Sequence, residues 1–185
     1  MCAYIGIDLA ASEKRCSGVA VIADKRIETV LCLSTDRSIV SFVDAVRARW
    51  HSIVMAIDAP LSLPRSSRGY RQVDKEVIKL GYRVLPISFR GMEMLTKRGI
   101  RLAQVFRSMG IKVLETHPRS ALKSSGCSDL KELVEVLRIE GFIDYGKRDL
   151  YDSVICAIVA FCADAGCAYE VRAQDGSIWL LKKLC

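Results

Sequence analysis

Four aspartates stand where an unpaired carboxylate would be costly. Asp8 lies inside the first apolar run of the chain, and Asp58 ends a later apolar run. Asp149 and Asp152 are three residues apart at the start of the most apolar helical segment, so they share one face of a helix. Carboxylates that gather at one place repel one another unless a cation binds between them, and oxygen ligands favour Mg²⁺ or Mn²⁺. The pattern predicts a metal site formed by Asp8, Asp58, Asp149 and Asp152.

The chemistry expected of such a site is phosphodiester hydrolysis. Two divalent ions about 4 Å apart activate a water and stabilise both the attacking and the leaving oxygen. Each acid also has a structural interpretation. Asp149 can cap a helix, Asp152 can interact with the helix dipole, and Asp58 can end a strand in a turn before Ala-Pro. Asp8 is the hardest to explain structurally, because strands disfavour aspartate.

Glu115 and His117 are further candidate catalytic residues. Glu115 ends an apolar run and is followed by Thr116, His117 and Pro118. If that strand lies beside the one that ends at Asp58, Glu115 reaches the same edge of the sheet as a fifth acid. His117 can then act as a proton shuttle or a phosphate contact, or simply cap a turn.

Positive charge is concentrated in one part of the chain. The net charge is +7, yet residues 65–112 carry twelve basic and three acidic side chains, so the remaining chain is slightly acidic. This concentration is typical of phosphate-backbone binding, and the excess of arginine favours bidentate phosphate contacts. A solvated surface on a heat-adapted protein is the alternative. The candidate nucleic-acid contacts are Arg65, Arg68, Arg71, Lys75, Arg90, Lys97, Arg98 and Arg101.

The elements that must position these residues alternate along the chain. Runs rich in β-branched residues predict strands over 4–9, 18–23, 27–33, 53–57 and 112–115. Apolar periodicity predicts helices over 38–50, 73–80, 93–109, 130–140 and 149–165, and a hairpin closes the chain over 169–181. This order predicts an α/β protein with a mixed sheet and helices on both faces. We expect a single domain over residues 1–185, with a basic insertion at about 61–110.

Five short segments resemble a known family. They are YIGIDLA at 4–10, AIDAPLSLP at 56–64, RGYRQVD at 68–74, ETHP at 115–118 and DLYDSVICA at 149–157. In this order they resemble the domain-of-unknown-function family 429, predicted nucleases of the ribonuclease H fold. The resemblance implies a five-stranded sheet of order 3-2-1-4-5, with Asp8 on the first strand, Asp58 on the fourth, and Asp149 and Asp152 on the final helix. The Asp-x-x-Asp pair is also similar to that of RuvC-type Holliday-junction resolvases.

We therefore expect a metal-dependent nuclease that acts on DNA or RNA with two Mg²⁺ or Mn²⁺ ions. Two alternatives stay open. A non-catalytic nucleic-acid-binding protein on the same fold would bind in a salt-dependent but metal-independent way. Phosphoryl transfer on a small substrate is the other, since actin-like sugar kinases share this core. A junction-cleaving enzyme needs two active sites, so that activity would predict a two-fold homodimer.

Composition indicates the setting in which the protein works. Nothing at the N-terminus resembles a signal peptide, and the longest apolar run, 154–163, is about half of the ~20 residues needed to cross a bilayer, so we expect a cytoplasmic protein without membrane contact. Asparagine is absent and glutamine occurs three times, which suggests a thermophilic source. The eight cysteines include no C-x-x-C pair, which argues against structural zinc and leaves buried thiols or one or two disulfides.

Overall fold

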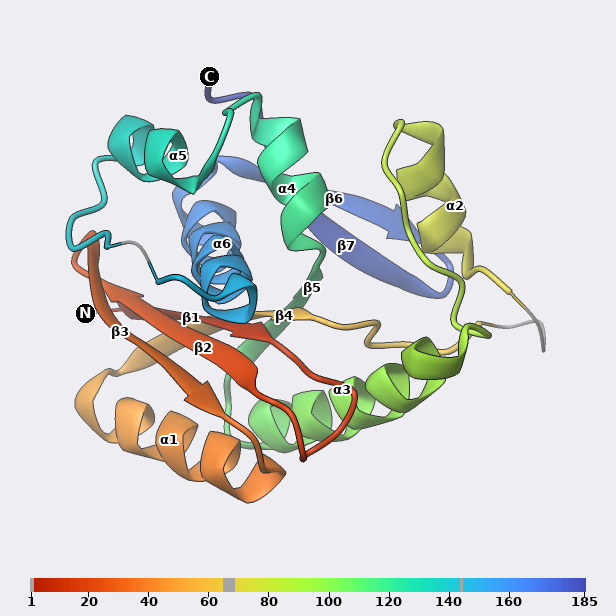
Figure 1. Ribbon diagram of the computed structural model, residues 1–185, viewed down its shortest axis with the longest axis horizontal. Helices are drawn as coiled ribbons and strands as arrows, with labels where there is room; N and C mark the ends of the chain where they lie inside the picture. The colour runs from red at the N-terminus through yellow and green to blue at the C-terminus, as the bar shows by residue number, and fades with distance from the viewer. Residues whose placement is uncertain (1, 65–68, 144) are drawn as a thin grey trace.

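A mixed sheet of seven strands forms the centre of the molecule (Figure 1). The computed structural model describes residues 2–64, 69–143 and 145–185. The strands lie in the order β3-β2-β1-β4-β5-β7-β6. Their bounds are β1 Cys2–Asp8, β2 Ser17–Ala23, β3 Arg26–Leu33, β4 Ser52–Asp58, β5 Lys112–Thr116, β6 Ala168–Ala173 and β7 Gly176–Leu181.

The first five strands have the predicted order 3-2-1-4-5. Strand β2 runs antiparallel to β1 and β3, whereas β1, β4 and β5 are parallel to one another. The turn between β2 and β3 places both Asp24 and Lys25 at positive φ, the backbone conformation of a tight hairpin turn. The predicted C-terminal hairpin does not stand apart from the sheet. Strand β7 pairs in parallel with β5 through Thr116 and Trp179, so the hairpin extends the sheet to seven strands.

Helices cover both faces of this sheet. Helices α1 (Asp36–Arg49) and α3 (Arg90–Ser108) lie on one face, where they pack with Ile5, Ile7, Met55 and Ile57. Helix α6 (Arg148–Ala165) crosses the other face over β1, β2 and β4, beside α4 (Pro118–Ser125). The smaller α2 (Gln72–Lys79) lies near β6 and β7, and α5 (Leu130–Leu137) packs against α4. Among the described residues, no helix is long and apolar enough to cross a membrane.

Two glycines let α6 lie directly on the sheet. A Cβ at Gly6 would stand 2.0 Å from the carbonyl oxygen of Ser153 and 2.1 Å from the amide nitrogen of Ala157. A Cβ at Gly18 would stand 2.0 Å from the carbonyl oxygen of Asp149. Only hydrogen fits at either position, because both neighbours are backbone atoms that cannot swing away. The close contact fixes the first turn of α6 at the carboxyl end of β1.

Helix α4 is absent from the sequence prediction. The motif Thr116-His117-Pro118 was expected only to close the fifth strand, but the helix begins at Pro118. Proline suits the first turn of a helix, because its missing N–H would have no intrahelical partner there. The helix ends at Gly126, which adopts the left-handed conformation (φ 79°) typical of a helix C-cap.

Six of the eight cysteines form disulfides. The pairs are Cys16–Cys32, Cys127–Cys185 and Cys162–Cys167, while Cys2 and Cys156 are free thiols. Three bridges exceed the one or two expected.

Candidate metal centre

Asp8 and Asp58 lie side by side at the carboxyl ends of two parallel strands. They are Cα partners in the β1–β4 register, and neighbouring strands are about 4.8 Å apart. Side chains alternate along a strand, and Gly6 and Ala56, two residues earlier, both face α6. Both carboxylates therefore lie on the α6 side of the sheet, at the edge where ligands bind in open α/β sheets.

Asp149 in the first turn of α6 and Asp152, three residues later, reach the same place. All four aspartates line one cavity of about 670 Å³, and each is partly buried. The N-terminus of a helix carries a partial positive charge, which favours carboxylates in its first turn. The structure thus brings together the four acids that the sequence predicts, from β1, β4 and α6.

Burial raises the pKa values of three of these carboxylates, those of Asp8, Asp58 and Asp152. Burial, together with the charges of Asp152 and Asp149, raises the pKa of Asp8 to about 7. Burial also raises the pKa of Asp58 well above its ordinary value, with added repulsion from Asp8 and Asp152. The pKa of Asp152 is raised by burial as well. Full ionisation of this cluster therefore requires nearby positive charge.

Two arginines outside the predicted set supply part of that charge. The Nε of Arg148 donates to Oδ2 of Asp152 at 3.3 Å. Arg119, exposed on α4, lines the cavity, and its charge lowers the pKa of Asp8, Asp58 and Asp152. Arg148 could have been predicted from the sequence as a site residue, because it directly precedes Asp149. Arg119 could not, because its position depends on α4.

Glu115 lines the same cavity but is fully engaged by protein donors. Its Oε2 accepts hydrogen bonds from Arg71 Nη1 at 2.8 Å and from the Leu61 amide at 2.7 Å, and its Oε1 accepts from Arg71 Nη2. Arg71 Nη2 also donates to Asp74 Oδ1 at 2.7 Å. This buried ion pair ties the start of α2 to β5. We therefore interpret Glu115 as an anchor of the insertion rather than as a fifth metal ligand.

His117 lies at the cavity as the N-cap residue of α4. Its Nδ1 is 2.7 Å from the hydroxyl oxygen of Ser120. Burial, together with the charge of Arg119, lowers the pKa of His117 to about 4. The imidazole is therefore neutral at physiological pH and able to take up one proton.

Two of the predicted nucleic-acid contacts are buried, which corrects their assignment. Arg71 is 1% exposed, and although burial lowers its pKa, Glu115 and Asp74 raise it overall. Arg98 is 3% exposed and donates to Asp36 and to the carbonyl oxygens of Ala10 and Ser34. Both guanidinium groups hold the insertion to the scaffold, so neither presents itself to a phosphate backbone.

The remaining members of the predicted interface have mixed positions. Lys97 is exposed and pairs with Glu93, and Arg101 is exposed and pairs with Asp36. Lys75 is exposed on α2. Arg65 and Arg68 lie outside the described residues, as does the side chain of Arg90.

Basic side chains do surround the carboxylates, but most come from other elements. Arg83, Arg119, Lys123 and Arg148 line the cavity that holds the four aspartates. An adjoining hollow of about 420 Å³ between α4 and α6 is lined by Arg119, Arg148 and Lys147. The two hollows share Arg119, Arg148 and Asp152, so a positively charged rim borders the acidic centre.

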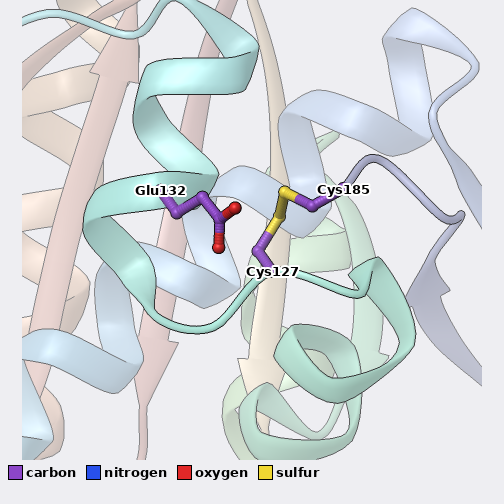
Figure 2. Close-up of side chains that lie close together, drawn as sticks. All are labelled: Cys127, Glu132 and Cys185. Carbon is purple, nitrogen blue, oxygen red and sulfur yellow. A yellow bond between two sulfur atoms is a disulfide. The ribbon is translucent and has the colours of Figure 1, made fainter.

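A second group of potential metal ligands lies far from this centre in the sequence. Figure 2 shows Glu132 beside the disulfide between Cys127 and Cys185. The two sulfur atoms are bonded to each other, and Glu132 accepts hydrogen bonds from Ser128. In this state the group ties the C-terminal segment to the loop before α5 and is not a metal centre.

A mixed sheet of order 3-2-1-4-5, with acids at the ends of its two central strands and on the last helix, defines a ribonuclease H-like protein. The structure is similar to that of T. thermophilus RuvC in complex with a Holliday junction substrate, with a TM-score of 0.52 and 18% sequence identity. The match covers 90% of this chain and 97% of that chain. At this identity the likeness shows the fold.

The chain belongs to the family described as "Protein of unknown function (DUF429)", whose profile matches residues 6–175. The resemblance seen in the sequence is thereby confirmed over most of the chain. No curated protein sequence matches this chain.

Proposed function

We propose that this protein is a metal-dependent nuclease that hydrolyses nucleic-acid phosphodiesters, with Asp8, Asp58, Asp149 and Asp152 as the ligands of two Mg²⁺ or Mn²⁺ ions. The observation that carries the proposal is the convergence of four partly buried carboxylates from three elements into one cavity. The pKa values of Asp8 and Asp58 are raised by burial and by the charges of their neighbours. Because these carboxylates repel one another, bound cations would stabilise the ionised cluster.

The donor set fits these ions. Carboxylate oxygens are the ligands that Mg²⁺ and Mn²⁺ prefer, and an all-protein cage is not needed, because such ions keep water or substrate oxygens in their coordination shells. When bound, two such ions polarise the phosphoryl group, lower the pKa of a bound water and stabilise the leaving oxygen.

The residues around the acids supply the other requirements of the reaction. Arg119, Lys123 and Arg148 line the cavity and would bind and orient the anionic backbone of DNA or RNA. His117, which is neutral, can accept a proton at the cavity wall. The structural neighbour is described in complex with a Holliday junction, which supports nucleic acid as the ligand class.

The experiment is a cleavage assay with labelled single- and double-stranded DNA and RNA in Mg²⁺, Mn²⁺ or EDTA. We compare the wild type with Asp58→Asn and with Asp44→Asn, which changes an exposed aspartate on α1 across the sheet. Cleavage should require Mg²⁺ or Mn²⁺, survive in Asp44→Asn and fall at least about 100-fold in Asp58→Asn.

Two results would contradict the proposal in different ways. Unchanged cleavage by Asp58→Asn means that the metal centre is assigned to the wrong residues. Wild-type protein that cleaves nothing, but binds nucleic acid with steep salt dependence and without a metal requirement, is the non-catalytic binding protein.

A further inference from the structure

The cavity that holds the carboxylates also has an apolar wall. Tyr82, Val84 and Leu85 come from the extended segment between α2 and α3, and Met92 and Leu95 come from the first half of α3. In Figure 1 this segment runs from the end of α2 back down to the start of α3. Leu85 is 55% exposed, so its side chain is largely available to a ligand. A volume of about 670 Å³ is ample for one small organic group, since ligand cavities span about 300–1,000 Å³.

Tyr82 is held in place from both sides. The ammonium group of Lys123 on α4 lies 5.7 Å from the centre of the Tyr82 ring and donates to the carbonyl oxygen of Gly81 at 3.2 Å. The side chain of Tyr82 also interacts with that of Tyr169 on β6 and raises its pKa. The aromatic ring is thus fixed before a ligand arrives, which lowers the entropic cost of binding.

The cavity also has a charged rim. Arg83 neighbours the apolar wall, while Arg119 and Arg148 stand beside the aspartates and continue into the hollow that Lys147 lines. An anionic group bound at this rim would lie in the same cavity as the apolar wall. A nucleotide unit has this combination, with a charged phosphate attached to a flat, largely apolar base face.

A continuous duplex does not offer that combination at one site. Its base faces are stacked on one another and covered, so only an unstacked base can leave the strand and lie on a protein surface. Proteins that take single strands combine a positively charged groove with aromatic and apolar platforms for the bases. The chain carries both features around one acidic centre.

We propose that the wall formed by Tyr82, Val84, Leu85, Met92 and Leu95 receives an unstacked nucleobase adjacent to the phosphate at the carboxylate centre. The preferred substrate is then single-stranded or splayed nucleic acid, and continuous duplex is a poor one. This inference rests on the proposed function in that it takes nucleic acid as the ligand.

The test measures binding apart from cleavage. Fluorescence anisotropy in Ca²⁺ compares a labelled single-stranded 12-mer with its blunt duplex, on the wild type and on Leu85→Ser, Tyr82→Ala and Leu63→Ser. Leu63 is the matched control, because it lies in the same insertion and is 56% exposed, close to the 55% of Leu85, but does not line the cavity. Leu85→Ser changes a largely exposed side chain, so the test does not depend on whether Tyr82→Ala folds normally.

We expect the wild type to bind the single strand at least tenfold more tightly than the duplex. Tyr82→Ala should weaken single-strand binding by about 5- to 150-fold, the effect of one stacked base, and Leu85→Ser by about fivefold, while Leu63→Ser leaves it unchanged. A single strand with abasic sites should bind the wild type as weakly as the intact strand binds Tyr82→Ala.

Equal affinity for single strand and duplex, or wall variants that bind like the wild type, would overturn the nucleobase site. Its failure is distinguishable from failure of the nuclease proposal. Metal-dependent cleavage of duplex as fast as of single strand removes the base site and leaves the nuclease. Wall-dependent single-strand binding without any cleavage removes the nuclease and leaves the base site.

Discussion

Replacing Asp8 with asparagine should stabilise the metal-free protein at alkaline pH. Burial and the charges of Asp152 and Asp149 raise the pKa of Asp8 from 3.8 to about 7. The folded protein therefore binds the Asp8 proton more tightly than the unfolded chain does, and the free energy of unfolding falls as the pH rises from about 4 to about 7. One pKa unit corresponds to about 1.4 kcal/mol, so the penalty reaches about 4 kcal/mol above pH 7.

Asparagine does not ionise, so Asp8→Asn escapes this penalty. At pH 8 in EDTA the free energy of unfolding of the variant should exceed that of the wild type by up to about 4 kcal/mol. For a chain of this size this corresponds to a Tm higher by about 10 °C. At pH 4 the two proteins should differ by less than about 1 kcal/mol, because Asp8 is then protonated in the folded protein and only about half ionised in the unfolded chain. The pH dependence of the difference, rather than its value at one pH, identifies repulsion as the cause.

Adding Mn²⁺ should narrow the difference between the two proteins at pH 8. A ligand present at 100 times its Kd stabilises the folded state by about 2.7 kcal/mol, and the wild type has one more charged ligand to offer than Asp8→Asn. The assay is thermal and urea unfolding at pH 4 and pH 8, each in EDTA and in Mn²⁺, with Asp44→Asn as the exposed control. Equal destabilisation by Asp8→Asn at both pH values, or equal stabilisation of both proteins by Mn²⁺, would refute the reasoning.

Four further substitutions examine other parts of the structure. Gly6→Ala should cost about 3 kcal/mol or more in urea unfolding, since a Cβ there would lie 2.0 Å from the Ser153 carbonyl oxygen. Arg71→Met should cost about 3–5 kcal/mol by the same measurement, because it leaves two buried carboxylates without their cation. Cys185→Ser opens a disulfide between residues 58 positions apart and should cost about 4 kcal/mol, and dithiothreitol, which opens all three bridges, should destabilise the wild type at least as much. Arg119→Gln should weaken nucleic-acid binding and reduce the slope of log K against log salt by about one, as anisotropy titrations would show.

The acidic centre was accessible from the sequence because it depends on local patterns, whereas the strand order was implied by the family resemblance. Asp8 and Asp58 interrupt apolar strands, and each stands at the carboxyl end of its strand. Once those strands are parallel neighbours, the two carboxylates must meet. The Asp149–Asp152 spacing likewise fixes a shared helix face without any knowledge of the fold. These residues could be predicted together because sheet and helix periodicity alone determine their directions.

Other features depend on contacts that no local pattern records. From the sequence, Pro118 was interpreted only as part of the motif that closes the fifth strand. Proline also begins helices, and the packing of α4 against α6 and β7 favours a helix here. Missing α4 meant missing Arg119 and Lys123, which line the cavity. The union of the hairpin with the sheet rests on Thr116 and Trp179, whose pairing spans more than 60 positions.

The basic insertion shows most clearly why a charge count along the chain differs from a charge distribution in space. Arg71 and Arg98 belong to the twelve basic residues counted there, yet their partners Glu115 and Asp36 lie 44 and 62 positions away. Those ion pairs neutralise positive charge that a count along the sequence assigns to ligand binding. The rim of the acidic centre takes most of its arginines and lysines from α4 and the start of α6, in the part of the chain whose net charge is slightly acidic. The insertion contributes Arg83 and the apolar wall to this cavity. Its proposed role is therefore to bind an unstacked nucleobase, rather than the phosphate backbone as the sequence predicted.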